Sequence, residues 1–351
     1  MKSRIAPSAN FKNPFGLLFR MLTSGKRAAY AALAHEAIRI ASRPLDALLA
    51  GREARTISAN KSSGQPVLLL VGAPRSGTTL AYQVLSRYLD VSYFSNLTSF
   101  FPRSPISGSQ MFGWLARQHR ADFDNFYGQT AGLSGPNDGF AIWNQWLGDD
   151  RFAPRTDLSS DELRSMCQFF DTWTATFGKP FLNKNNRNTS CLDQLCLAIP
   201  NARCIVIRRN PVLVAQSLIK AREQVQGDKN VGWGLKAHEN AASEDRLAYV
   251  DDVCDQIVQI EQELDEQLSR IPSDRVVEVT YEGFCENPIA ALREIVSQIP
   301  QVRLREDLIE AELKPFRVSS VISLTSDEHR RVLRRLEHYS GARESCRTAS
   351  N

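Results

Sequence analysis

The clearest pattern in the chain is a continuous apolar run from Val67 to Val71, which follows a polar stretch and Pro66. Hydrophobicity that does not alternate is typical of a strand buried on both faces, as in the parallel sheets of α/β proteins. Three later runs are also strand-like, and each of the four is followed by helix-like sequence. These later runs are residues 180–183, 204–207 and 276–280, and the helix-like segments are about 78–89, 192–198, 212–222 and 289–299. Such alternation predicts parallel βαβ units.

Two regions do not join this alternation. Residues 100–178 are rich in Gly, Pro and aromatic residues, which predicts a helical and loop insertion that either walls a substrate pocket or adds to the core. Its tryptophans are Trp114, Trp143, Trp146 and Trp173. Residues 242–270 have apolar positions on one helical face, and we assign that face of a long helix to packing.

The N-terminal segment differs in charge from the rest. Residues 1–55 contain ten Lys or Arg and three acids, a net charge of 10 − 3 = +7, so the remainder carries 4 − 7 = −3. Apolar positions around Leu33, Ile38 and Ile40 fit an amphipathic helix. The favoured interpretation is a helical arm packed on the domain. The alternatives are a basic helix lying on an anionic membrane surface and, third, an organelle-targeting peptide.

Length and composition predict a soluble globular protein. The chain has 351 residues, of which 42% are hydrophobic and 23% charged, and its net charge of +4 is too small to indicate a nucleic-acid partner. Seven cysteines without a CxxC pair indicate free thiols in a reducing compartment, and the cysteines and histidines lack zinc-ligand spacing. No run approaches the ~20 apolar residues that span a bilayer, and no secretory signal is recognisable. We expect three parts: an arm (1–60), a main domain (61–340, with the insertion at about 100–178) and a tail (341–351).

A glycine-bounded turn after the first strand carries the candidate chemistry. A strand, such a turn and a helix start together form an anion site, because backbone N–H groups converge there and the helix dipole favours negative charge. The spacing of Gly72 and Gly77 matches the first half of a Walker-type loop, but Thr78 stands where a nucleoside triphosphatase has Lys. Arg75 is the loop's strong cation. The loop therefore suits a phosphate-type group better than a magnesium–triphosphate complex.

A second candidate anion site follows the strand at 204–207. Arg209 lies at the carboxyl end of that strand, Pro211 begins a helix, and Ser217 lies on it. Ligands of open α/β sheets bind outside the carboxyl ends of the strands, where an Arg and a hydroxyl can bind a second phosphate. The alternative is that Arg209 pairs with a surface carboxylate and Ser217 is a neutral helix residue. The presence of the first loop favours the phosphate interpretation.

These motifs resemble those of the sulfotransferases that use 3′-phosphoadenosine 5′-phosphosulfate (PAPS). The sequence Pro-Arg-Ser-Gly-Thr-Thr-Leu at 74–80 resembles the 5′-phosphosulfate loop of that family, and Arg209 with Ser217 resembles its 3′-phosphate motif. Residues 181–187 resemble the family's strand-end segment with Lys184, and residues 279–288 resemble a late strand and helix of bacterial members. The resemblance covers about residues 66–300.

The resemblance implies a P-loop-like parallel β-sheet flanked by helices, and sulfuryl transfer from PAPS to a hydroxyl group without a metal. The acceptor class is a small molecule, glycan or glycolipid, with a carbohydrate or lipid-linked acceptor favoured. From the free thiols we expect a cytoplasmic location, and from the basic N-terminal segment peripheral contact of residues 1–55 with the inner membrane face as an addition. The implied site residues are Arg75 and Lys184 for charge stabilisation, Arg75, Ser76, Gly77, Thr78 and Thr79 for the 5′ end of the donor, and Arg209 and Ser217 for the 3′-phosphate.

The catalytic base is where the sequence departs from the family pattern. Tyrosylprotein sulfotransferases have a Glu after the loop helix, but residues 94–97 contain no acid, and Asn186 stands where cytosolic members have His. We predict Asp138 as the base, with Trp143 and Trp146 packing against an acceptor sugar. The alternative is that Asn-Asp-Gly at 137–139 is an ordinary turn, and the next candidates are His238 and Glu282. Two rival functions stay open: a P-loop phosphotransferase or nucleotide-binding protein, and an inactive PAPS-binding homologue.

Overall fold

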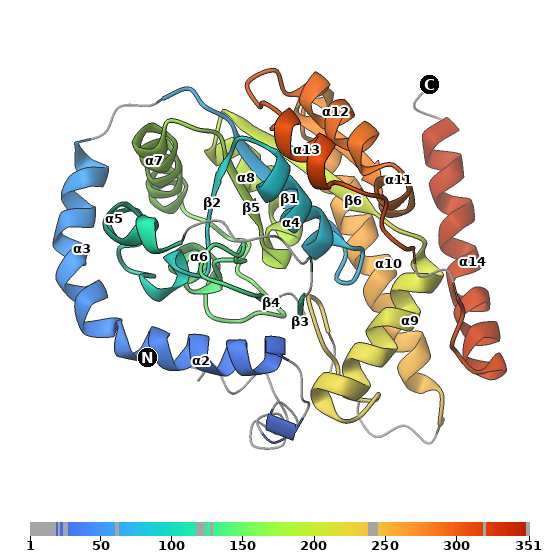
Figure 1. Ribbon diagram of the computed structural model, residues 1–351. Helices are drawn as coiled ribbons and strands as arrows, with labels where there is room; N and C mark the ends of the chain where they lie inside the picture. Colours follow the sequence, from blue (N-terminus) through green and yellow to red (C-terminus); the bar gives the residue numbers. More distant parts are fainter. Residues whose placement is uncertain are drawn as a thin grey trace.

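A five-stranded parallel sheet forms the centre of the protein (Figure 1). The computed structural model describes residues 19, 22–23, 27–59, 63–116, 123, 125–126, 129–237, 245–318 and 321–348. The strand order is β2-β5-β1-β6-β7, with bounds Ser92–Tyr93, Phe181–Lys184, Val67–Val71, Ala202–Arg208 and Val276–Thr280. The predicted α/β class and its four strands are confirmed. Strand β2 was missed because two residues are too few to carry a pattern.

The apolar run of β1 is buried on both sides of the sheet, as its composition predicts. Its odd-numbered residues pack in a cluster with α7 (Ser160–Phe177) and α8 (Leu192–Ala198). Its even-numbered residues pack on the opposite face against α4 (Thr78–Tyr88) and α12 (Pro288–Gln298). Because all strands are parallel, the segments that follow β1, β5 and β6 leave the sheet at the same edge.

A third apolar cluster joins helices beyond the sheet. It is formed by α9 (Pro211–Ala221), α10 (Ala248–Leu268) and α14 (Ser326–Thr348). Val250, Val253 and Ile257 of α10 are buried in it, which confirms the packing face predicted within residues 242–270. A π-helical turn, Arg222–Gln226, continues α9. Helices α11 (Tyr281–Glu286) and α13 (Glu306–Glu312) lie beside α12 (Figure 1).

The predicted insertion is helix and loop with one short hairpin. It contains α5 (Pro105–Phe112), β3 (Asn125–Phe126), β4 (Gln129–Thr130), α6 (Phe140–Leu147) and α7. Trp143, Trp146 and Trp173 are at most 2% exposed and pack among phenylalanines of the core. The prediction that Trp143 and Trp146 contact an acceptor sugar is therefore wrong, because α6 turns both rings toward the sheet.

The N-terminal arm has two helices, of which α3 runs down the left side of the molecule and α2 along its lower edge in Figure 1. Helix α2 (Arg27–Ala41) contacts the turn at Thr98–Phe100 and the β3–β4 hairpin, and α3 (Arg43–Ser58) packs on α5 and α7. Within the described ranges, no helix combines the length and apolar character that a membrane crossing requires.

Candidate active site

Two glycines shape the turn between β1 and α4. Gly72 has φ +151° and Gly77 has φ +99°, values that L side chains rarely adopt. A Cβ atom would lie 2.5 Å from the carbonyl oxygen of Ile207 at the first position and 2.0 Å from the ring of Tyr281 at the second. Gly77 is also the N-cap of α4 and offers no side-chain acceptor, so N–H groups of the first turn are left for an anion.

Arg75 connects the turn between β1 and α4 (residues 72–77), which we call the phosphate loop, to the second predicted anion site. Its Nε atom donates to Ser217 Oγ at 3.0 Å, across 142 positions of sequence. Arg209 Nη1 donates to the carbonyl oxygen of Arg75 at 3.0 Å. The fold thus brings Arg75, Arg209 and Ser217 into one cluster at the carboxyl ends of β1 and β6.

Tyr281 covers this cluster from α11. The guanidinium carbon of Arg209 lies 4.4 Å from the centre of the Tyr281 ring, a cation–π contact. Burial raises the pKa of Tyr281 to about 12, so its hydroxyl stays neutral. The same ring lies against Gly77, and it therefore fixes the distance between the loop and Arg209.

Two polar atoms of the cluster are buried without a hydrogen-bond partner in the described part of the chain. They are Ser76 Oγ and Arg209 Nε. An unsatisfied buried polar group costs about 1–3 kcal/mol. Arg209 lines the pocket, and an anion bound there would supply an acceptor to its guanidinium, so the residues present fit a phosphate-type ligand.

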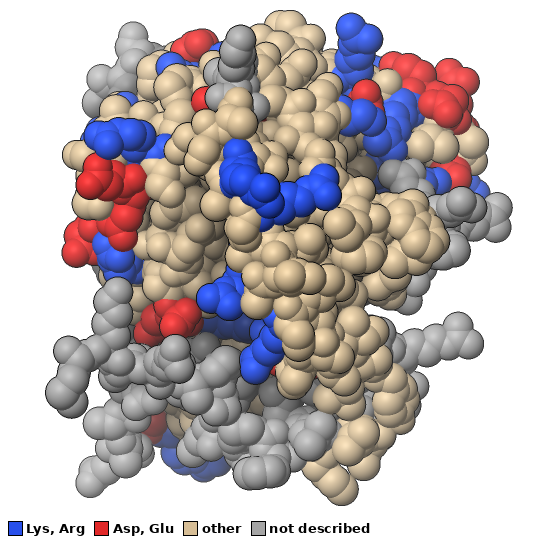
Figure 2. Space-filling model, turned by 90° about the vertical axis from the view of Figure 1, so that its left-hand side faces the viewer, with Lys and Arg blue, Asp and Glu red and all other residues tan. Residues whose placement is uncertain are grey.

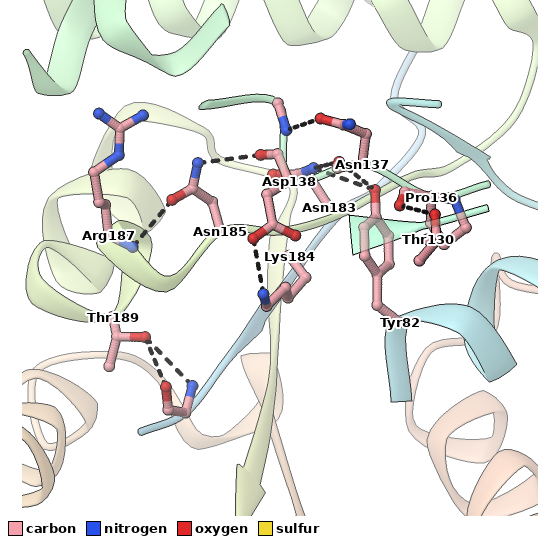
Figure 3. Close-up of polar contacts among 12 residues, drawn as sticks. Tyr82, Thr130, Pro136, Asn137, Asp138, Asn183, Lys184, Asn185, Arg187 and Thr189 are labelled. Atoms are coloured by element: carbon pink, nitrogen blue, oxygen red, sulfur yellow. Dashed lines mark hydrogen bonds and ion pairs between the residues drawn. The ribbon is translucent and has the colours of Figure 1, made fainter. Parts of the chain in front are cut away.

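Lys184 and Asp138 form an ion pair at the end of β5 (Figure 3). Lys184 Nζ lies 2.8 Å from Asp138 Oδ2, and the two side chains are only 4% and 12% exposed. Asn185 Nδ2 donates to the carbonyl oxygen of Asp138 at 3.1 Å, which fixes the backbone of the Asp138 turn. The two predicted catalytic residues therefore contact each other directly.

A buried hydrogen-bond network holds the Asp138 turn against the sheet (Figure 3). Asn183 Nδ2 donates to Tyr82 Oη at 3.2 Å and to the Asn137 carbonyl oxygen at 3.3 Å. Asn183 Oδ1 accepts from Trp143 Nε1 at 2.8 Å. Burial raises the pKa of Tyr82, which keeps its hydroxyl protonated as the donor to the Asn137 carbonyl at 3.2 Å. Trp143 thus supports the site from the core.

Arg187 ties α6 to the segment after β5. It is fully buried, and it donates to the carbonyl oxygens of Phe140 and Gly148 and to Asn144 Oδ1. Desolvation, followed by repulsion from Arg151, lowers the pKa of Arg187 to about 10, so it remains charged near neutral pH. These bonds anchor both ends of α6, and they position the Asp138 turn that precedes it.

One pocket collects most of these groups. Of the predicted site residues, Arg75, Gly77, Thr78, Thr79, Asp138, Lys184 and Arg209 line it. Ser76 and Ser217 are not among the lining residues, although Ser217 is bonded to Arg75. The lining residues to which sequence reasoning gave no role include Phe140, Arg151, Phe152, Asn186, Trp233 and Tyr281.

Arg151 adds a second cation on the Asp138 side of the pocket. Its guanidinium carbon lies 4.6 Å from the centre of the Phe140 ring. Desolvation lowers the pKa of Arg151, and the charge of Asp138 opposes that effect. Of the alternative bases, Glu282 accepts from the Asn210 N–H at 3.2 Å and does not line the pocket, and His238 lies outside the described residues. The described residues contain no group of three or more His, Cys, Asp or Glu suited to a metal ion.

Comparison with known proteins gives a family and a fold. Residues 66–300 match the model of the Sulfotransferase family. The structure is similar to sulfotransferase STF9 from Mycobacterium avium, with 16% identity, a TM-score of 0.55, and coverage of 84% of this chain and 80% of that one. It is also similar to sulfotransferase STF1 from Mycobacterium tuberculosis H37Rv, with 13% identity, a TM-score of 0.50, and coverage of 91% and 84%. At sequence identities this low, the similarity to these two structures shows the fold alone. No curated protein matches the chain.

Proposed function

The chain belongs to the sulfotransferase family, and on that premise we propose that it transfers a sulfuryl group from PAPS to a hydroxyl group of a carbohydrate or lipid-linked acceptor. The observation that carries the proposal is the contact between the phosphate loop and the Arg209–Ser217 pair through Arg75. Two adjacent anion sites match a donor with a phosphosulfate at one end and a 3′-phosphate at the other. A nucleotide without the 3′ group would leave the second site unfilled.

The proposed roles follow from the charges in the pocket. Loop N–H groups and the hydroxyls of Ser76, Thr78 and Thr79 hold the 5′ end, and Arg209 with Ser217 holds the 3′-phosphate. In the reaction the acceptor oxygen attacks sulfur, the bond between sulfur and the bridging oxygen of the 5′-phosphate breaks, and the acceptor proton passes to Asp138. Arg75 and Lys184 stabilise the charge that develops on the oxygens in a desolvated site. We assign no step to a metal.

The acceptor side of the pocket supports a sugar or lipid-linked hydroxyl. Phe140, Phe152 and Trp233 line the pocket together with Asp138. Aromatic rings offer apolar contact area to a sugar ring or an alkyl chain, while a carboxylate can orient the hydroxyl. We also propose that the protein is cytoplasmic and that residues 1–55 make peripheral contact with the inner membrane face. The proposal includes no nucleic-acid partner.

Calorimetry with adenosine 3′,5′-bisphosphate and ATP tests the donor assignment. We expect the bisphosphate to bind in the absence of magnesium, and ATP to bind at least tenfold more weakly, the equivalent of about 1.4 kcal/mol, because it lacks the 3′-phosphate. Equal affinities, or ATP binding that depends on magnesium, would favour the P-loop phosphotransferase alternative. Release of the bisphosphate only when acceptor and PAPS are both present would distinguish an enzyme from an inactive homologue.

The Arg209→Ala variant is expected to bind adenosine 3′,5′-bisphosphate roughly tenfold to a hundredfold more weakly, since a charge-assisted hydrogen bond contributes about 1.5–3 kcal/mol. Its affinity for adenosine 5′-phosphosulfate, which has no 3′-phosphate, should barely change. Ser217→Ala should show the same selectivity with a smaller loss. Arg203→Ala on the same strand, outside the pocket lining, serves as the control. Equal losses for both ligands would mean that Arg209 does not contact the 3′-phosphate.

A further inference from the structure

Helix α3 buries Leu49 in the ordinary way, but it departs from the usual polarity of a surface helix at other positions. Its two acids, Asp46 and Glu53, are 2% and 4% exposed, whereas Leu48 is 78% exposed. Surface helices of soluble proteins normally direct apolar residues to the core and charges to water. The outward face of α3 is therefore not explained by the stability of this chain alone.

The buried acids explain how α3 stays in place without its leucine at position 48. The carboxylate of Asp46 accepts from the Arg103 N–H at 3.1 and 3.2 Å and from Ser104 Oγ at 2.7 Å. Glu53 accepts from the backbone N–H groups of Ile106 and Ser107 at 2.9 and 2.7 Å. These donors belong to the start of α5, where the helix dipole also favours negative charge. These polar contacts and buried Leu49 together dock α3, and Leu45 and Leu48 are left exposed.

The outward residues of α3 form a single stripe. Leu45, Leu48, Arg52 and Arg55 are spaced by three, four and three positions, so they share one face of the helix, and all four are exposed. Ile38 and Ile40 of the preceding helix are also exposed, at 47% and 51%, but they point to different sides of α2 because they are two positions apart. We call these four residues the arm surface: Leu45, Leu48, Arg52 and Arg55.

The charge of the arm surface has one sign. Because both acids of α3 are buried, its exposed charges are all arginines. Figure 2 views the side of the molecule along which α3 lies. It shows Lys and Arg side chains near the middle of that face, uncharged surface beside them, and Asp and Glu side chains toward the left. The sequence of residues 1–26 adds five Lys or Arg and no acid. Exposed leucines beside arginines are complementary to an anionic lipid interface, since the leucines can enter the acyl boundary while arginine heads stay with the phosphates.

We propose that the arm surface binds the surface of an anionic lipid bilayer. The chain then lies on the membrane through α3, and no helix within the described ranges is long and apolar enough to cross it. A second copy of the chain suits this surface less well, because two such faces would bring arginines of like charge together. This inference deepens the peripheral membrane contact of residues 1–55 in the proposed function. Its test uses no enzymatic readout, so its failure would leave the proposal of sulfuryl transfer standing.

Co-sedimentation of the full chain with vesicles tests the proposal. Two vesicle compositions are compared: phosphatidylcholine alone, and phosphatidylcholine mixed with phosphatidylglycerol. We expect binding to the anionic vesicles that weakens as salt is raised, because surface charges are screened beyond a Debye length of about 8–10 Å at physiological salt. Binding of the phosphatidylcholine vesicles should be weaker by at least about fivefold per arginine engaged.

Substitutions in the stripe separate the apolar contribution to vesicle binding from the electrostatic contribution. Leu48→Ser should weaken vesicle binding about tenfold, and Arg52→Gln with Arg55→Gln about fivefold each. Leu197→Ser is the matched control, since Leu197 is 77% exposed on α8 and lies outside the arm, and Arg293→Gln on α12 controls for charge. Both controls should bind like the unmodified chain. All variants should keep the same melting temperature, because the changed side chains are exposed.

Three results would overturn the proposal. One is equal binding to neutral and anionic vesicles. Another is equal weakening by Leu48→Ser and Leu197→Ser. The last is that the chain binds neither vesicle type and sediments as a dimer, whereas the Leu48→Ser variant sediments as a monomer. In that case a second copy of the chain, and not a bilayer, would cover the arm surface.

Discussion

The Asp138→Asn variant is expected to transfer sulfuryl groups roughly 10²–10⁴ times more slowly, the range typical of losing a general base. The amide keeps the size of the carboxylate and cannot accept the acceptor proton. Binding of adenosine 3′,5′-bisphosphate should be intact, because the phosphate loop and Arg209 are untouched. Single-turnover assays with bound PAPS measure the transfer rate, and calorimetry measures donor affinity.

The ion pair with Lys184 makes a second variant necessary. Loss of the Asp138 charge leaves the nearly buried Lys184 ammonium without its partner, which costs stability and can displace Lys184. Lys184→Gln and the double variant complete a mutant cycle. If Asp138 is the base, Asp138→Asn abolishes the acidic limb of the pH profile of kcat/KM, whereas Lys184→Gln lowers the rate and keeps that limb. Melting temperatures of all three variants control for folding.

Two results would argue against Asp138. Turnover of the Asp138→Asn variant at the unmodified rate would move the search to Glu282 and His238. The second result is an Asp138→Asn variant that keeps the acidic limb of the pH profile and reacts at the same rate as Lys184→Gln. Asp138 would then act by positioning Lys184, and not as the base.

Arg75→Ala should lower turnover by roughly 10²–10³, the loss observed when one preorganised donor at a developing charge is removed. Donor affinity should fall less, because the carbonyl oxygen of residue 75, which accepts from Arg209, is retained in alanine. Arg75→Lys should recover part of the rate, since it restores the charge without the planar guanidinium. Rates under saturating PAPS measure the first effect, and calorimetry measures the second.

Ser217→Ala is the matched control for Arg75, because it removes the acceptor of Arg75 Nε and keeps the cation. Its turnover should lie well above that of Arg75→Ala. An Arg75→Ala protein with full activity, or one that fails to fold, would remove Arg75 from the proposed mechanism.

Features that depend on neighbouring residues were predictable from the sequence. The β1 run is uniformly apolar because helices cover both faces of the sheet there. Gly72 and Gly77 mark a turn in which a Cβ atom would clash with neighbouring atoms. The Arg209–Ser217 spacing correctly placed a cation and a hydroxyl near the phosphate loop, because parallel strands leave the sheet at a common edge.

Features that depend on distant packing were not predictable. Arg151 lies in irregular backbone, so no periodic pattern marks it, and its neighbour Phe140 belongs to a separate helix. Tyr281 lies between the predicted strand at 276–280 and the predicted helix at about 289–299, and only its contact with Gly77 and Arg209 gives it a place in the pocket. Trp143 is an aromatic residue close to Asp138 in sequence, and we therefore predicted that it contacts an acceptor sugar. The orientation of α6 places its side chain in the core instead.

The central position of β1 also governs how the protein is made. The hydrogen-bonding partners of this strand are β5 and β6, which begin 181 − 67 = 114 and 202 − 67 = 135 residues later in the chain. During translation Val67–Val71 emerges long before either partner, as an apolar, uncharged segment of the kind that aggregates when exposed. Pairings so distant in sequence also slow folding. The phosphate loop therefore forms late, and production of the protein should respond strongly to chaperones and to the speed of synthesis.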